Sequence, residues 1–162
     1  MTSADIEKYS KRREALVRHI EKVFQSCELL GGRLIDAGEI ALGHKLIANG
    51  LLHDNSKFYG VEWVYLNDEA KNITPELFTA ALNHHQTINK HHPEAWEGGI
   101  HTMDRLHLAE MICDCHARAA EFGTNLREWV KDSATKRYNM TPQSKAYKEL
   151  KDIMDILLDS TF

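Results

Sequence analysis

Apolar residues recur at helical spacing from the start of the chain. In the first segment they are Ile6, Leu16, Ile20, Val23, Cys27 and Leu30. Steps of three or four residues place such positions on one face of an α-helix. Thr2 and Asp5 have the spacing of a capping box at the start of this segment. The pattern predicts a first helix over roughly 4–30, ended by the adjacent glycines Gly31 and Gly32.

The next segment, roughly 34–53, also follows a helical pattern. It places Ile40, His44, Ile47 and Leu51 on one face. Three glycines weaken the helix, since each costs about 1 kcal/mol relative to alanine in a helix interior. These are Gly38, Gly43 and Gly50. We therefore expect a second helix, with a break near 37–39.

The middle of the chain predicts two shorter helices and a loop. Residues 62–70 form the first short helix. Thr74 is suited to cap the second, which starts with Pro75 at its first position and ends near Asn89. Pro93 and the glycine pair at 98–99 then mark a loop.

Three helices are predicted for the rest of the chain. One covers 102–122 and stops at Gly123, the second covers 126–138, and Thr141 with Pro142 begins the last. Its apolar stripe consists of Leu150, Ile153, Met154 and Leu157. No segment shows the period-2 alternation of a strand, and no repeat or linker divides the chain. The sequence predicts a single all-α domain over 1–162, a helical bundle of about six to seven helices.

Composition narrows the class of protein. A chain of 162 residues is long enough to bury roughly 70% of its unfolded surface. Its net charge of −4 argues against binding of long nucleic acid. A small anionic substrate stays compatible, because a metal ion reverses the local field. The cysteines are odd in number (Cys27, Cys113 and Cys115), and no apolar run is long enough to cross a membrane. We expect a reduced, cytoplasmic protein without membrane contact; a homo-oligomer is compatible with the sequence.

Histidines and aspartates supply the candidate chemistry. The chain has ten histidines, and three doublets stand out: His53-Asp54, His84-His85 and His91-His92, with Asp114 further on. Imidazole and carboxylate together suit Mn, Fe, Co, Ni or Zn ions. The neighbours His53 and Asp54 both reach one ion if the backbone turns away at the end of the helix. This inventory predicts a site for one or two divalent metal ions, with Mg as a further candidate.

The remaining histidines have alternative readings. His44 precedes His53 by nine residues, about 13.5 Å along a helix, so we interpret it as a core residue or a support for a ligand. His85 continues an apolar helical face, so it is preferred as a ligand over His84, which is its orienting neighbour or a surface residue. His101 and His116 are interpreted as structural or exposed.

Asp114 shares one helix face with Glu110 and His107, which favours a wall of the site, although a solvated face stays open for both neighbours. Cys113 and Cys115 flank Asp114 and are expected to pack as small apolar groups. Trp63, Trp96 and Trp129 are interpreted as core residues, with stacking on a nucleotide base as the alternative.

Two stretches resemble a known family. Residues 51–58, LLHDNSKF, resemble the LLHDxxK signature of the HD superfamily of metal-dependent phosphohydrolases. Residues 84–96, HHQTINKHHPEAW, are similar to an uncharacterised HD-like family of phages and bacteria that pairs HDxSKF with NxHHPExW. The resemblance covers roughly 15–122, and the C-terminal helices at 124–160 lie outside it. It implies an HD-domain-like helical bundle with metal and phosphoester chemistry, but no particular substrate.

The resemblance also implies a ligand set. His19 matches the isolated upstream histidine, Asp114 matches the final aspartate, and the paired histidines match those of two-metal members. The implied metal ligands are His19, His53, Asp54, His85, His91, His92 and Asp114. The candidate catalytic residues are Asp54, Lys57 and Glu110, where Asp54 orients water and Lys57 brings a positive charge to phosphate oxygens. For Lys57 a solvated side chain is the alternative.

These residues predict a metal-dependent phosphohydrolase that cleaves a small phosphate ester such as a nucleotide. Two alternatives stay open. One is a di-iron oxygenase, because the ligand inventory also resembles that of myo-inositol oxygenase. The other is a module that binds a nucleotide or a metal without turnover.

Overall fold

The computed structural model describes residues 3–66 and 73–159, with side chains described from residue 6 onward. Its helices are α1 (Ser3–Asp36), α2 (Ile40–Leu52), α3 (Gly60–Tyr65), α4 (Pro75–Ile88), α5 (Arg105–Phe122), α6 (Leu126–Glu128), α7 (Thr135–Arg137) and α8 (Lys145–Leu158). Three 3₁₀ helices, η1 (Asn55–Phe58), η2 (Pro93–Ala95) and η3 (Gly99–His101), and a π-helical segment, η4 (Trp129–Ala134), connect them. The described residues contain no strand, so the all-α prediction is confirmed. The helix predicted over 62–70 corresponds to α3, which begins at Gly60 and already ends at Tyr65. The predicted cap at Thr2 and positions 67–70 lie outside the described residues.

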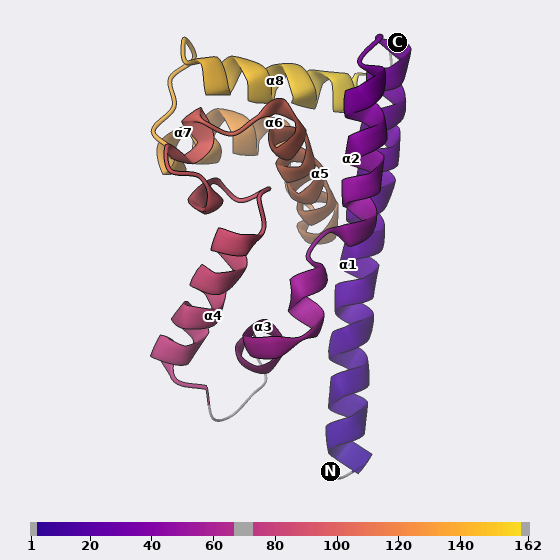
Figure 1. Ribbon diagram of the computed structural model, residues 1–162, viewed down its shortest axis with the longest axis vertical. Helices are drawn as coiled ribbons and strands as arrows, with labels where there is room; N and C mark the ends of the chain where they lie inside the picture. The colour runs from indigo at the N-terminus through magenta and orange to yellow at the C-terminus, as the bar shows by residue number, and fades with distance from the viewer. Residues whose placement is uncertain (1–2, 67–72, 160–162) are drawn as a thin grey trace.

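Helix α1 is one uninterrupted helix of 34 residues, about 51 Å long. It forms the long edge of the molecule in Figure 1. The predicted stop at Gly31 and Gly32 is wrong, because Gly31 lies where α1 crosses α2. A Cβ atom at Gly31 would lie 2.9 Å from the carbonyl oxygen of Gly43, and one at Gly43 would meet the backbone of Gly31. The glycines serve close packing rather than helix termination.

The predicted break near 37–39 is confirmed, since α1 ends at Asp36 and α2 begins at Ile40. The predicted buried face of α2 is wrong. Its buried residues are Gly43, Leu46 and Gly50, whereas Ile40, His44 and Leu51 are exposed. Gly43 and Gly50 are the points of α2 where a Cβ atom would meet α1, at Gly31 and Cys27. His44 is therefore neither a core residue nor a support for a ligand.

The apolar core joins α1 and α2 to α5, η4 and α8. It includes Val23, Leu30, Leu46, Ile112, Val130, Leu150 and Ile153. Helix α5 starts at Arg105 rather than at the predicted 102, because the side chain of Asp104 caps it. It ends at Gly123 in the left-handed conformation, as predicted.

The C-terminal segments differ from the prediction in detail. Residues 126–137 are helical, but a π-helical segment lies between α6 and α7. Helix α8 starts after Ser144, whose hydroxyl accepts a hydrogen bond from the Tyr147 backbone N–H. The predicted start at Thr141 is wrong, because the Ser144 N–H donates to the Thr141 carbonyl in a turn before the helix. The predicted apolar stripe of α8 is buried, as expected.

Helix α4 begins at Pro75 with Thr74 as its cap, as predicted, and ends before Asn89. It lies on the side of the bundle opposite α1, with α3 between their lower ends in Figure 1. No helix in the described ranges is long and apolar enough to cross a membrane. The end of α2, the end of α4 and the middle of α1 and α5 contribute side chains to one buried polar centre.

Candidate metal centre

His53 and Asp54 lie where the backbone leaves helix α2. His53 is extended at φ −50° and ψ 130°, and Asp54 is left-handed at φ 53° and ψ 20°. Aspartate tolerates this left-handed region better than most residues. The turn brings the two neighbours together, with His53 Nε2 3.5 Å from Asp54 Oδ2. Both side chains are almost fully buried.

His19 of α1 and Asp114 of α5 meet beside this pair. His19 Nε2 lies 3.1 Å from Asp114 Oδ1, and His53 Nε2 lies 3.9 Å from the same oxygen. We call His19 and Asp114 the helix half of the centre, because both project from long core helices.

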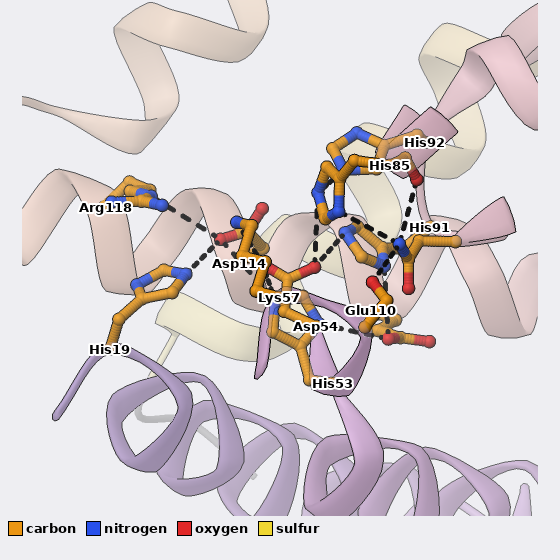
Figure 2. Close-up of polar contacts among 12 residues, drawn as sticks. His19, His53, Asp54, Lys57, His85, His91, His92, Glu110, Asp114 and Arg118 are labelled. Atoms are coloured by element: carbon orange, nitrogen blue, oxygen red, sulfur yellow. Dashed lines mark hydrogen bonds and ion pairs between the residues drawn. The ribbon is translucent and has the colours of Figure 1, made fainter. Parts of the chain in front are cut away.

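His85, His91 and His92 surround the other oxygen of Asp54. Asp54 Oδ1 lies 3.4 Å from His85 Nε2 and 3.5 Å from His91 Nε2. His92 Nε2 lies 3.0 Å from His85 Nε2. We call these three histidines the loop half, because two of them lie in the loop after α4. All seven ligand residues implied by the sequence thus lie in one cluster, shown in Figure 2, with Asp54 between the two halves.

Five buried polar atoms in the cluster have no hydrogen-bond partner among the described residues. They are His19 Nε2, His53 Nε2, Asp54 Oδ1, His91 Nε2 and Asp114 Oδ1. Burying an unpaired polar group costs free energy, so native proteins pair nearly all of them. Imidazole nitrogens and carboxylate oxygens at this spacing fit a divalent transition metal. The residues present therefore fit one or two such ions.

Three glutamates hold the outer nitrogens of these histidines. Glu121 Oε1 lies 3.1 Å from His19 Nδ1, and Glu62 Oε2 lies 2.8 Å from His85 Nδ1. Glu110 Oε1 lies 3.1 Å from His53 Nδ1 and 3.4 Å from His91 Nδ1. Each carboxylate favours a proton on Nδ1, which leaves the lone pair of Nε2 directed into the centre.

Glu110, a candidate catalytic residue, lies behind two histidines. Its carboxylate contacts the Nδ1 atoms of His53 and His91 and accepts a further hydrogen bond from Asn49, a position that suits support of candidate ligands. Glu62 and Glu121 were not singled out by the sequence. Glu121 lies seven residues after Asp114, on the same helix face, so extending that face by two turns would have found it. No pattern in the sequence marks Glu62.

The other histidines lie outside the ligand cluster. His84 is half-exposed, and its Nδ1 lies 2.9 Å from Glu62 Oε1, so it borders the support of His85. His107 pairs with Asp104 at 2.7 Å and packs edge-on against Trp96. His116 bonds Ser26, and His101 is exposed. Trp96 and Trp129 pack against the core, whereas Trp63 stacks on Tyr9.

Two cations approach the ligand carboxylates. Lys57 Nζ lies 2.5 Å from Asp54 Oδ2 with its side chain 15% exposed, so the solvated alternative for Lys57 is wrong. Arg118 Nε lies 3.9 Å from Asp114 Oδ1, with 44% of its side chain exposed. Figure 2 shows both cations beside the cluster.

The surroundings keep the carboxylates ionised. Burial raises the pKa of Asp54, but the neighbouring His53 and Lys57 lower it by more, so the pKa lies below the ordinary value. For Asp114, burial is likewise outweighed by the nearby imidazoles of His19 and His53, and its pKa is also lowered. Burial and the neighbouring His91 lower the pKa of His92 to about 3. Anionic carboxylates and a neutral imidazole are the protonation states that bind metal.

The cysteines show no sign of activation. Burial raises the pKa of both Cys113 and Cys115 well above the ordinary thiol value. All three cysteines of the chain are free, and Cys27 and Cys113 lie in the apolar core. This agrees with their interpretation as packing residues.

A pocket of about 370 Å³ lies on the α1–α2 side of the centre. Its lining includes Val17, Phe24, Leu51 and Phe58, together with His53. The His53 side chain has no exposed surface, so this pocket offers no path to its Nε2 atom.

Comparisons with known proteins show family membership. No curated protein and no solved structure matches the chain. Residues 8–160 match the family described as "Family of unknown function (DUF5662)", which covers nearly the whole sequence. The chain therefore belongs to this family.

Proposed function

We propose that the protein is a metal-dependent phosphohydrolase of the HD type, acting on a small phosphate ester such as a nucleotide. The observation that carries the proposal is the convergence of five buried imidazole and carboxylate atoms that have no hydrogen-bond partner in the described part of the chain. The motifs around His53-Asp54 and His91-His92, which resemble the HD superfamily, support it. The three free cysteines accord with a reducing compartment, and we place the protein in the cytoplasm.

The number of ligands favours two ions. Seven ligand residues exceed what one catalytic ion takes while it keeps a position for water. Asp54 has one oxygen toward His53 and the other toward His85 and His91, so it is suited to bridge two ions. His19, His53 and Asp114 would hold one ion, and the loop half would hold the other.

Bound ions would supply an activated water and polarise a phosphoryl oxygen. The residues of the chain supply position and charge. Asp54, between the two halves, would orient such a water, and the Lys57 ammonium group lies 2.5 Å from the Asp54 carboxylate. Five carboxylates outnumber the nearby cations, so the centre without ions disfavours a phosphate and the centre with ions favours it.

The direct experiment has two stages. Protein purified without chelator is analysed for transition metals, and the metal-loaded protein is screened for phosphate release from nucleotides and simple phosphate esters. We expect bound metal and release from at least one ester, both abolished by chelation. If no ester is hydrolysed and oxygen is consumed with a polyol, the protein is an oxygenase. If a nucleotide binds without turnover, it is a binding module.

Lys57→Ala tests the proposed charge contact. We expect turnover to fall about a hundredfold to a thousandfold, because a charge contact to the transferring group is lost. Metal content should stay unchanged, since the ion replaces Lys57 as the partner of Asp54. Without metal, the variant should be less stable, because removing one member of a buried pair leaves the other unpaired.

The matched control for Lys57→Ala is Lys151→Ala. Lys151 also pairs with a carboxylate at 2.5 Å, but on the exposed surface of α8. The Lys151→Ala variant should match the wild type in turnover and metal content. Wild-type turnover in Lys57→Ala would remove Lys57 from the reaction.

A further inference from the structure

Arg118 lies at the side of the centre that solvent reaches. It follows Asp114 by one turn of α5, and Figure 2 shows it beside Asp114. The Asp114 side chain is 18% exposed, against 2% for Asp54 and 0% for His53. Lys57 and His92 are also partly exposed, and a substrate that enters beside Asp114 passes Arg118.

The guanidinium of Arg118 stands beside the centre without entering the ligand set. Its Nε lies 3.9 Å from Asp114 Oδ1, too far for a hydrogen bond. Its Nη1 lies 3.3 Å from Glu121 Oε2, in a pair one helical turn apart on the surface of α5. Arg118 is 44% exposed and Glu121 17%, so the pair is partly solvated and adds little stability, and the contact uses only Nη1 of the guanidinium.

The chemistry of Arg118 suits a phosphoryl group. A guanidinium carries five N–H donors in a planar fork that matches two phosphate oxygens. Lys57 is already within 2.5 Å of Asp54, deeper in the centre. Arg118 is then the cation placed to meet an oxygen that faces solvent.

We propose that Arg118 binds the outward-facing oxygen of the substrate phosphate and so selects phosphomonoesters over diesters. This rests on the proposed function. A monoester has three non-bridging oxygens, so two face the ions and Lys57 while the third faces Arg118. In a diester, an ester substituent replaces one of those oxygens, and the contact with Arg118 is lost or blocked.

The test compares Arg118→Gln, Arg118→Lys and a matched control. Arg127→Gln is the control, since Arg127 has the same 44% exposure and pairs with Asp155 and Asp159 instead. Manganese-loaded proteins are titrated with inorganic phosphate by calorimetry. Rates are then measured with p-nitrophenyl phosphate and with bis(p-nitrophenyl) phosphate.

We expect Arg118→Gln to lower phosphate affinity and monoester kcat/KM about tenfold to a hundredfold, the range of a hydrogen bond to a charged group. Arg118→Lys should recover part of the loss, because it keeps the charge without the fork. The diester rate, the metal content and the melting temperature should match those of Arg127→Gln.

Three results would overturn the inference. The first is phosphate affinity in Arg118→Gln equal to that of the control. The second is an equal loss for monoester and diester, which removes the selectivity. The third is a wild-type protein that binds metal but no phosphate. If the wild type binds phosphate yet hydrolyses no ester, the proposed function fails while the phosphate titration still decides the role of Arg118.

Discussion

The two halves of the metal centre are held in place by different forces. His19 and Asp114 project from α1 and α5, which span 34 and 18 residues and pack together in the apolar core. In the loop half, His85 lies in the last turn of α4, which buries only Ala81 besides His85 itself. His91 and His92 follow in the loop. Apolar packing therefore positions the helix half far more than the loop half.

Hydrogen bonds around Glu62 compensate in the loop half. Glu62 has no exposed surface, and it binds the outer nitrogens of His84 and His85 together with the hydroxyl of Ser56. The side chain of Asn89 joins this group by donating to Ser56 Oγ. The comparison shows that a centre can be rigid by packing on one side and by a polar network on the other. Local opening favours regions with few apolar contacts, so the loop half should open first.

The largest effect is expected where the halves meet. Asp54→Asn should lose both ions, because Asp54 groups with His19 and His53 on one side and with the loop half on the other. Asparagine tolerates the left-handed backbone at φ 53°, so the fold should persist. Elemental analysis should find metal content near zero. The stabilisation that wild type gains from metal, about 2.7 kcal/mol at a hundred times Kd, should vanish.

Asp104→Asn is the control for Asp54→Asn. It changes an aspartate into an asparagine at the cap of α5, where asparagine also caps well. Its metal content should equal that of wild type. One ion retained by Asp54→Asn would show that the halves do not share this carboxylate.

A smaller effect, confined to the loop half, is expected for Glu62→Gln. The amide offers only one acceptor to three donors, which should cost about 1–3 kcal/mol of stability. One ion should bind about tenfold to a hundredfold more weakly, because His85 loses its orienting carboxylate. Manganese titration should resolve one weakened and one unchanged site. Glu94→Gln, at a surface pair with Arg137, is the control; equal weakening of both sites would contradict the division into halves.

The smallest effect is expected for Glu121→Gln in the helix half. Glutamine still accepts a hydrogen bond from His19, and packing keeps His19 in place. We expect the affinity for one ion to fall about tenfold, at the low end of such effects. The free energy of unfolding, measured with denaturant, should fall by less than about 1 kcal/mol. A loss as large as that of Glu62→Gln would show that packing does not secure this half.

Local patterns and the family resemblance singled out the histidines and aspartates that cluster, and local patterns placed the caps at Thr74 and Gly123. The close approach of distant segments was not predicted. The position of His53 and Asp54 at the end of a helix implied a turn that brings them together. Thr74 caps the start of α4 and Gly123 caps the end of α5, as their chemistry predicts. The prediction that the first helix ends at Gly31 was wrong because the role of Gly31 depends on Gly43 of another helix. The role of Glu62 was not predicted because its partners His84 and His85 lie more than twenty residues away in the sequence.

The crossing at Gly31 and Gly43 links the spacing of two helices to the metal centre. His19 lies 12 residues before Gly31 and His53 lies 10 residues after Gly43, so both histidines belong to the same helical hairpin. The two helices approach each other closely at the glycines. The ring centroids of the two histidines lie 5.9 Å apart, further along the same pair of helices. A methyl group added at Gly31 or Gly43 would push the two helices apart. The spacing of two candidate ligands therefore depends on two positions that carry no side chain.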